Sequence, residues 1–464
     1  MRRVLCSILI GASVLAVKGQ GTVAFEQLRA RAENGFPAAQ YNLAVMYESG
    51  DGVAQNFKKA VEWYRKAAEA EYPEAQYNLG VCCLAGRGVA LDEALGAAWF
   101  QKAAVNGNER AQHNLGYCYF AGRGVSQNYQ RAVLWFEKAA RQGDPDAQYN
   151  LGLCHAEGKG TTQNAAKAVK LYTAAARQGH SEALYALGCC YLTGTGIEPD
   201  AVRAVTCYEK AANSGYAKAQ YSLAVCLQKG AGTPQNLQKA LLRFVQAAEQ
   251  GDVDAEYGLA LCYAEGMGAD QDPVKAVEFF RKAAGRGHVE AQCELGYCFS
   301  DGQGVEQSHE KAVEWFRLAA EQGHADAQFR LGFCYFKGTG VSQKKSVAAD
   351  WFLKAAGQGS STACYNLGIC YEEGEGVPLN PAKAAQWYLE SAKLGLGYGQ
   401  EAVSLCCFMG NGLPQSKVDG YAWALLAAGN GCDALDNEHI RALEDNERSA
   451  GRERADALLA TMPQ

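Results

Sequence analysis

The sequence has no excess of positive charge. Its 44 lysines and arginines stand against 50 aspartates and glutamates, which gives a formal net charge of −6. Binding to nucleic acid or to an anionic membrane through charge requires a basic surface, so we expect neither kind of partner. Apart from a run near the N-terminus, no apolar stretch approaches the roughly 20 residues that a membrane-spanning helix needs. The composition therefore predicts a protein without a membrane span.

Histidine is scarce, and the common motifs of metal sites and catalytic sites are missing. The 7 histidines form no cluster in the sequence, and no two cysteines have the C-x-x-C spacing of zinc or redox sites. Ser342 and Lys345 form an S-x-x-K pair, but the S-D-N and K-T-G motifs of penicillin-binding proteins do not follow. We therefore predict no metal site, no cofactor and no catalytic residue, and we do not expect a small-molecule ligand.

The first 19 residues differ from the rest of the chain. Met1–Arg3 is basic, and Val4–Val17 is an apolar run of 14 residues that ends in small residues. A basic start, a short apolar run and a small-residue cleavage site are typical of a secretory signal peptide. We expect residues 1–19 to be such a signal, which predicts export to the periplasm or the cell exterior. A cytoplasmic protein with an uncleaved N-terminus is the alternative.

A period of 36 residues organises the remainder of the chain. Its first residue is alanine in ten consecutive copies and glycine in an eleventh, without any insertion: Ala39, Ala75, Ala111, Ala147, Ala183, Ala219, Ala255, Ala291, Ala327, Ala363 and Gly399. A fixed period of this length is typical of a solenoid, in which each repeat buries its apolar faces against its neighbours. We number the positions of each repeat from 1 to 36, beginning at these residues.

Each repeat is predicted to contain two helices. Position 5 is leucine in ten copies and position 6 is always small, so that positions 1, 5, 8, 9 and 12 form the packed side of a first helix. Glycines at positions 12 and 14 indicate its end and a turn that needs positive φ or close backbone approach. Position 18 carries Asn, Asp or Ser in ten copies, which are residues that cap the start of a helix. Only Lys344 departs from this rule.

The second helix has an aromatic residue at position 26 in all but the last copy and alanine at position 30 in every copy. All seven tryptophans lie at position 25, beside the alanines: Trp63, Trp99, Trp135, Trp315, Trp351, Trp387 and Trp423. Large rings next to small residues fill the space between closely packed helices. We therefore expect the tryptophans to be core residues between repeats.

These residues resemble a known family. The pattern A-x-Y-N-L-G-x-x-Y-x-x-G-x-G-V, followed by K-A-x-x-W-x-x-K-A-A-x-x-G, is almost complete in Ala111–Gly143 and Ala363–Gly395. It is similar to the Sel1-like repeat, a relative of the tetratricopeptide repeat, and the resemblance covers roughly residues 25 to 432. It implies an all-α fold, a right-handed α-solenoid of about eleven helix pairs, that binds other proteins.

The repeats also define the ends of the solenoid. We expect an N-terminal capping helix in residues 20–38, eleven repeats in residues 39–432 and C-terminal capping helices in residues 433–464. Phe25, Leu28 and Ala32 match the second helix when the register is extended backwards. The last segment is rich in charge, as befits a cap with a solvated outer face.

Ten of the 18 cysteines share position 8, on the packed side of the first helix. A thiol there acts as a small apolar side chain, and packed helices about 8–10 Å apart hold equivalent thiols too far from one another for a disulfide. In cysteine-rich members of the family that the chain resembles, the partner thiol lies on the second helix, where this sequence has alanine. We expect reduced, buried thiols. Export favours disulfides instead, and the sequence leaves this conflict open.

The opposite side of the first helix carries positions 3 and 7. Position 3 is tyrosine in seven repeats, and position 7 is an apolar or aromatic residue in all of them. In the related tetratricopeptide superhelix this side lines the concave groove that receives peptides, and tyrosine joins a large apolar ring to a hydroxyl. The resemblance thus implies a partner-binding groove in the central repeats. Its expected residues are Tyr149, Tyr185, Tyr221, Val225, Tyr257 and Leu261. The alternative is that these rings pack on a neighbouring first helix and bind nothing.

Two functions compete. The first is a non-enzymatic scaffold or adaptor that holds a segment of a protein partner in this groove. The second is a penicillin-binding or weak β-lactam-hydrolysing protein, which the cysteine-rich members of the family imply. The missing second-helix cysteines and the absence of a nucleophile paired with a base favour the scaffold.

Overall fold

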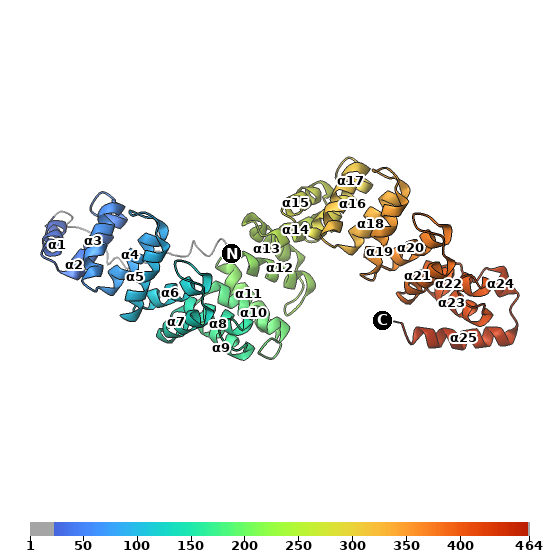
Figure 1. Cartoon of the computed structure of the whole chain (residues 1–464), viewed down its shortest axis with the longest axis horizontal. Helices are drawn as coiled ribbons and strands as arrows, with labels where there is room; N and C mark the ends of the chain where they lie inside the picture. Colours follow the sequence, from blue (N-terminus) through green and yellow to red (C-terminus); the bar gives the residue numbers. More distant parts are fainter. Residues whose placement is uncertain (1–22, 463–464) are drawn as a thin grey trace. The chain divides into compact units, whose positions relative to one another are not determined.

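The computed structural model describes residues 23–462 of the chain and, for side chains, residues 25–462. The expected signal peptide, residues 1–19, lies outside this range. Every regular element within the range is an α-helix, and helices α2 to α23 alternate along the chain as eleven first and eleven second helices (Figure 1). The predicted all-α solenoid of helix pairs is confirmed. Among residues 23–462, none of the helices has the length and apolar character needed to cross a bilayer.

Each pair consists of a first helix, an extended turn and a second helix. The first helices are α2 (Pro37–Ser49), α4 (Pro73–Ala85), α6 (Glu109–Ala121), α8 (Pro145–Glu157), α10 (Ser181–Thr193), α12 (Ala217–Lys229), α14 (Val253–Glu265), α16 (Val289–Asp301), α18 (Ala325–Lys337), α20 (Ser361–Glu373) and α22 (Gly397–Met409). The second helices are α3 (Phe57–Glu69), α5 (Glu93–Val105), α7 (Tyr129–Gln142), α9 (Ala165–Arg177), α11 (Ala201–Asn213), α13 (Leu237–Glu249), α15 (Pro273–Gly285), α17 (His309–Glu321), α19 (Lys345–Ala356), α21 (Pro381–Lys393) and α23 (Lys417–Gly429).

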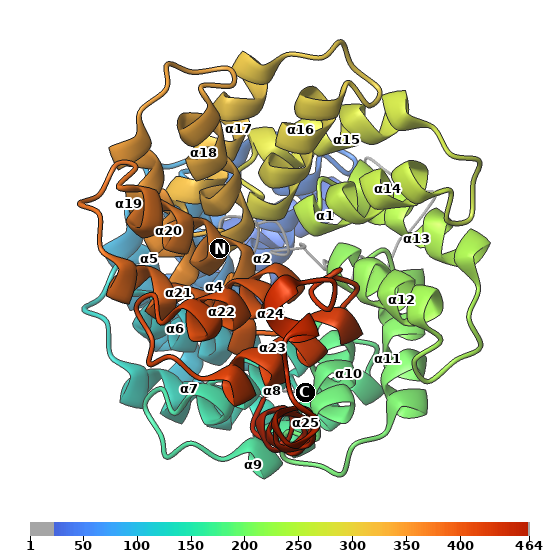
Figure 2. The ribbon, with the colours of Figure 1, turned by 90° about the vertical axis from the view of Figure 1, so that its right-hand side faces the viewer.

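Three further helices flank the pairs. They are α1 (Val23–Glu33), α24 (Glu438–Arg441) and α25 (Asp445–Leu459). Helix α1 packs on α2, and α25 lies alongside α23 in both Figure 1 and Figure 2. We propose that α1 at one end and α24 with α25 at the other are the caps of the repeat array.

Polar side chains cap the second helices as the sequence predicts. Asn128 Oδ1 accepts a hydrogen bond of 2.9 Å from the backbone N–H of Arg131, and the equivalent residue caps the second helix in ten of the pairs. In α19 the N-cap residue is Lys344, whose side chain makes no capping hydrogen bond. These local bonds fix where each second helix begins.

Glycine at position 14 joins successive repeats. Gly124 has a φ of 71°, which a residue with a side chain rarely adopts. A Cβ atom at Gly124 would lie 2.0 Å from the carbonyl oxygen of Glu93, at the start of the second helix of the preceding pair. The turn of one repeat therefore rests directly on the backbone of the repeat before it.

An aromatic ring at position 26 of the second helix lies at the centre of the pair in the repeats that have one, as in α6 and α7. Phe136 is 1% exposed, and a Cβ atom at Gly116, position 6 of the facing first helix, would lie 2.7 Å from that ring. Tyr64, Phe100 and Phe244 are buried in the same way. The small residue at position 6 is thus required because the aromatic ring occupies its space.

The prediction that the tryptophans form the core is wrong for six of the seven. Trp423 is buried, whereas the other six are only partly buried and pack at the margin of the core. Lys138 Nζ lies 4.1 Å from the ring centroid of Trp135, and Lys66 Nζ lies 3.9 Å from that of Trp63. A lysine thus covers the outer face of these indoles through a cation–π contact. The residue at position 26 lies in the core, and the residue at position 25 lies at the margin of the core.

The cysteines lie where the sequence places them. All 17 in the described range have free thiols, and eight of the ten at position 8 are buried. Burial raises the pKa of Cys118 and of Cys154 to about 11. The thiolate, which is the reactive form, is therefore disfavoured at these positions.

The chain divides into two compact units. Unit 1 ends at Gln235 and contains α1 to α12, and unit 2 begins at Asn236 and contains α13 to α25. The boundary falls inside the sixth helix pair, where the sequence period continues without interruption. The period alone predicts a single module and gives no sign of this boundary.

Candidate binding surface

The first helix of each pair has one packed side and one side that is partly open. In α8, Ala147 and Cys154 of the packed side are buried, whereas Tyr149 and Leu153 of the other side are partly buried. Apolar surface that folding leaves open is a candidate for recognition of a partner. The six residues that the sequence assigns to a groove lie on this side of their helices, four in unit 1 and two in unit 2.

In unit 1, Tyr149 and Tyr185 lie against rings of the second helix and of the loop that follows it. The ring centroid of Tyr149 is 5.9 Å from that of Tyr172 and 5.0 Å from that of His180. The ring centroid of Tyr185 is 5.9 Å from that of Tyr208. These are packing distances for aromatic rings, so part of each tyrosine belongs to the fold. These contacts are with the second helix and with the residue that precedes the next first helix, His180 before α10 for Tyr149 and Tyr216 before α12 for Tyr185.

Helix α12 contributes the remaining residues of unit 1. Tyr221 and Val225 are one helical turn apart on the same side of α12, and both are partly buried. Unit 1 thus presents a half-open aromatic or aliphatic side chain on each of α8, α10 and α12.

Unit 2 contributes Tyr257 and Leu261 from α14. The ring of Tyr257 stacks on His288 with a centroid distance of 4.5 Å and lies 6.0 Å from the ring centroid of Phe280. Leu261 is partly buried against the core of this unit. Within unit 2, Figure 2 shows α14 nearer than α13 to the inner side of the curve that the pairs follow, and α20 nearer than α19.

Carboxylates surround these tyrosines. Burial raises the pKa of Tyr149 to about 12, and the nearby carboxylates of Glu182 and Glu157 add to the shift. Burial likewise raises the pKa of Tyr257 to about 12, with Glu294 and Glu290 as charged neighbours. In both units the half-open surface therefore combines aromatic rings with negative charge.

The sequence of every repeat matches the same family. The pattern of the Sel1 repeat matches eleven consecutive segments, residues 37–72, 73–108, 109–144, 145–180, 181–216, 217–252, 253–288, 289–324, 325–360, 361–396 and 397–432. The chain belongs to the Sel1 repeat family. Each Sel1 repeat begins two residues before position 1 as numbered above. No protein among the curated sequences matches the chain.

One solved structure agrees with this assignment over nearly its whole length. A protective antigen of uropathogenic Escherichia coli strains, described as displaying an SLR fold, is 32% identical, with a TM-score of 0.84. The match covers 94% of this chain and 95% of that one. A Sel1 repeat protein from Oxalobacter formigenes is 31% identical over 53% of this chain and 96% of that one, with a TM-score of 0.49.

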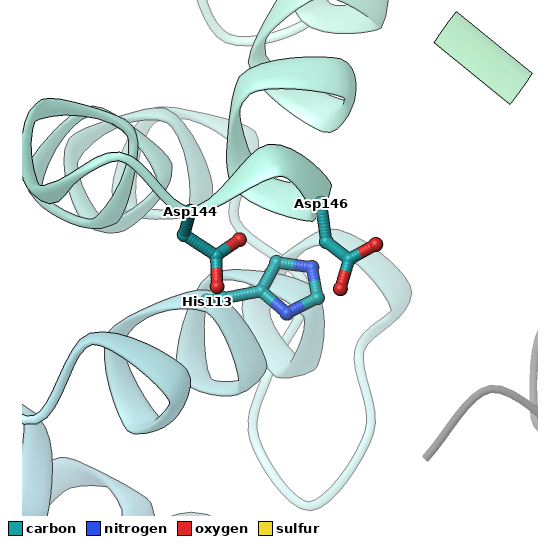
Figure 3. A group of neighbouring side chains, drawn as sticks. All are labelled: His113, Asp144 and Asp146. Carbon is teal, nitrogen blue, oxygen red and sulfur yellow. The ribbon is translucent and has the colours of Figure 1, made fainter. Parts of the chain in front are cut away.

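The third and fourth Sel1 repeats bring together three side chains that the sequence does not single out. His113 of α6 lies beside Asp144, which precedes α8, and Asp146, in the first turn of α8 (Figure 3). One ligand atom of each residue lies within 4.8 Å of those of the other two. The two carboxylates follow His113 by about thirty residues in the sequence, and only the packing of neighbouring Sel1 repeats makes them adjacent.

The S-x-x-K pair has a structural explanation in these repeats. Lys345 Nζ forms an ion pair with Glu375 and lies 5.7 Å from the ring centroid of Phe336, while Ser342 is exposed. A lysine held by a carboxylate is not available as the base that activates a serine. This arrangement does not favour the penicillin-binding alternative.

Proposed function

We propose that this Sel1 repeat protein is a non-enzymatic scaffold that binds a segment of another protein along its first helices. Membership of the Sel1 repeat family, whose members commonly act as interaction scaffolds, supports the general role. The observation that carries the proposal is the half-open aromatic and aliphatic surface on the first helices. Its residues are Tyr149, Tyr185, Tyr221 and Val225 in unit 1, and Tyr257 and Leu261 in unit 2.

The chemistry of this surface indicates the kind of segment that it binds. Tyrosine rings offer apolar contact area together with a hydroxyl, and such residues are frequent anchors in interfaces. Glu182 beside Tyr149 and Glu290 beside Tyr257 add negative charge at the same places. A segment with apolar side chains and interspersed lysine or arginine fits both features, because opposite charges steer association and fix register.

The test begins with the partner. A pull-down from the native host, followed by mass spectrometry, identifies candidate partners, and the affinity of the best one is then measured with purified full-length protein. Val225→Lys places a charge in the proposed surface of unit 1. Its matched control is Val202→Lys, because Val202 lies on the second helix α11 of the same unit and is 65% exposed.

We expect Val225→Lys to weaken binding by at least about tenfold, as loss of a central interface contact does, and Val202→Lys to leave the affinity unchanged. Melting temperatures of both variants establish that they are folded. Equal affinities for the two folded variants would contradict the proposal, since the first-helix surface would then have no part in binding.

We also propose that residues 1–19 are a cleaved export signal. The basic start and the short apolar run support this proposal. Intact-mass analysis of the protein from its native host is the test. A mature N-terminus close to residue 20 is expected, and a chain that retains Met1–Gly19 in full would refute the signal.

A further inference from the structure

His113, Asp144 and Asp146 form a compact group of one imidazole and two carboxylates in unit 1. Figure 3 shows the imidazole flanked by the two carboxylates, which reach it from the N-terminal end of α8. Because the three ligand atoms lie within 4.8 Å of one another, small rotations of the side chains would bring all of them into contact with a single ion. The donors come from two different helices, α6 and α8, that packing of the repeats holds in place.

The imidazole replaces a tyrosine without disturbing the fold. Position 3 is tyrosine in seven Sel1 repeats, and His113 is the one histidine found there. The ring of His113 lies 5.8 Å from that of Phe136, just as the ring of Tyr77 lies 5.7 Å from that of Phe100. His113 therefore keeps the ring contact of the repeat and adds nitrogen atoms that tyrosine does not have.

The two carboxylates are held in place by bonds of their own. Asp144 is 9% exposed, and its Oδ1 accepts a hydrogen bond of 2.6 Å from the backbone N–H of Ala147. Asp146 Oδ1 lies 3.0 Å from His180 Nε2. These contacts fix both side chains next to His113, as ligands of a metal site need to be fixed.

The charges of the group favour a bound cation. The carboxyl group of Asp146 lies close to a second carboxyl group, that of Asp144, which is buried. A divalent ion among these oxygens relieves the repulsion between two negative charges that otherwise share one small volume.

The imidazole also has a polar partner that holds its orientation. His113 Nε2 lies 2.9 Å from Asn150 Nδ2, on the next turn of α8, so the amide N–H donates to Nε2. Rotation of the amide group by 180° exchanges its nitrogen and oxygen. The oxygen then accepts the Nε2 proton, and the lone pair of the other ring nitrogen is left for a metal.

We propose that His113, Asp144 and Asp146 are a binding site for a divalent transition metal of the zinc type. A nitrogen donor beside two carboxylates suits Zn²⁺, Co²⁺ or Mn²⁺, whereas Ca²⁺ and Mg²⁺ prefer oxygen donors alone. Asp146 is exposed, so the site opens to solvent, and water completes the coordination of the ion. The site is independent of the proposed partner, and its test requires no partner.

The experiment uses the full-length protein with reduced thiols and measures Zn²⁺ affinity by calorimetry. Two variants remove ligands: His113→Tyr, which restores the residue of the other repeats, and Asp146→Asn. The control is His324→Asn, because His324 Nδ1 caps helix α18 in unit 2, outside the cluster, and asparagine is a good cap. Absorption spectra with Co²⁺ as the probe separate this site from the cysteines, since only thiolate ligands give an intense near-ultraviolet charge-transfer band.

The proposal predicts one Zn²⁺ site in the wild-type protein and in His324→Asn. It also predicts a loss of affinity of at least about tenfold in both ligand variants, because removal of an outer-shell partner already costs that much. Zn²⁺ should raise the melting temperature of the wild type and not that of His113→Tyr. Equal Zn²⁺ binding by the wild type and a folded His113→Tyr variant would overturn the site. A cobalt spectrum dominated by thiolate, or no binding to the wild type, would do so as well.

Discussion

Arg286, which directly follows α15, donates a hydrogen bond from Nη1 to Oε1 of Glu256, near the start of α14, over 3.1 Å. In four of the six preceding repeats the same two positions hold amides, as where Gln142 Nε2 donates to Gln112 Oε1 over 2.8 Å. Glu256 is 7% exposed, so this repeat has a buried carboxylate with a counter-ion where those repeats have a buried amide with an amide partner. The positive charge of Arg286 thus compensates the negative charge of Glu256.

This pair makes a prediction about stability. Arg286→Gln leaves the buried carboxylate of Glu256 without its counter-ion and should lower the free energy of unfolding by about 2–3 kcal/mol at neutral pH. The double variant Glu256→Gln with Arg286→Gln restores the amide pair and should lie within about 1 kcal/mol of the wild type. Urea denaturation measures both. Additive losses in the double variant would show that the two residues are not coupled.

Alanine substitutions at the two neighbouring aromatic positions of the second helix should lower the free energy of unfolding by different amounts. Phe136→Ala removes a fully buried ring and should cost about 3–5 kcal/mol, as large core truncations do. Trp135→Ala removes a partly buried ring beneath Lys138 and should cost less, about 1–2 kcal/mol. The two variants belong to one helix and one unit, so their denaturation curves are directly comparable. A larger loss of unfolding free energy for Trp135→Ala than for Phe136→Ala would contradict this assignment and indicate that the tryptophan is the core residue.

Alanine substitutions at two glycines with positive φ distinguish the cost of a strained backbone from the cost of a steric collision. Gly107 and Gly124 have φ of 89° and 71°, but a Cβ atom would meet nothing within 4 Å at Gly107. Gly107→Ala should therefore cost only about 1 kcal/mol, the conformational penalty of the left-handed region. Gly124→Ala adds a collision with the backbone of Glu93 and should cost at least about 3 kcal/mol. Similar melting temperatures for the two variants would contradict the docking role of position 14.

These comparisons indicate what the sequence predicts well. The helix pairs follow from local signals, because Asn128 caps its own helix and Gly124 forms its own turn. The difference between Trp135 and Phe136 is not local. Adjacent residues of a helix point about 100° apart, and the angle between packed helices decides which of them enters the core.

The thiols should react slowly in the native protein. Burial raises the pKa of Cys118 to about 11, so its thiolate is rarer at pH 8 than that of a free cysteine. We expect rapid alkylation only of the partly buried Cys189, Cys190, Cys334 and Cys432. In denaturant without reductant, all 17 thiols of the described range should react. A count below about ten would contradict the reduced thiols that position 8 predicts.

Burial of the Cys118 thiol should also make the free energy of unfolding fall as the pH rises. Unfolded thiols ionise near their ordinary pKa of 9.0, whereas the pKa of Cys118 in the folded state is about 11. The contribution of the buried, protonated thiol is complete below pH 9 and is lost as the pH rises to about 11. The free energy of unfolding should therefore fall over this interval, and less so in Cys118→Ala. An equal fall in that variant would assign the effect to other groups.

The candidate site was less predictable than the fold. The period places Tyr149, Tyr185, Tyr221 and Tyr257 on the first helices, but it does not reveal that Tyr149, Tyr185 and Tyr257 contact rings of the second helix. Nor does it bring His113 to Asp144, because that contact depends on how neighbouring repeats pack. For the tyrosines, replacement by alanine would change stability as well as binding, since Tyr185 packs on Tyr208.

The most direct test of the binding surface is hydroxyl-radical footprinting of the protein with and without its identified partner. The method reports the solvent accessibility of individual aromatic side chains, and Trp135 on the second helix α7 serves as the internal control. We predict that partner binding reduces oxidation of Tyr149, Tyr185 and Tyr221 and leaves that of Trp135 unchanged. Protection of Trp135 with unchanged oxidation of the three tyrosines would place the partner on the second helices and contradict the account.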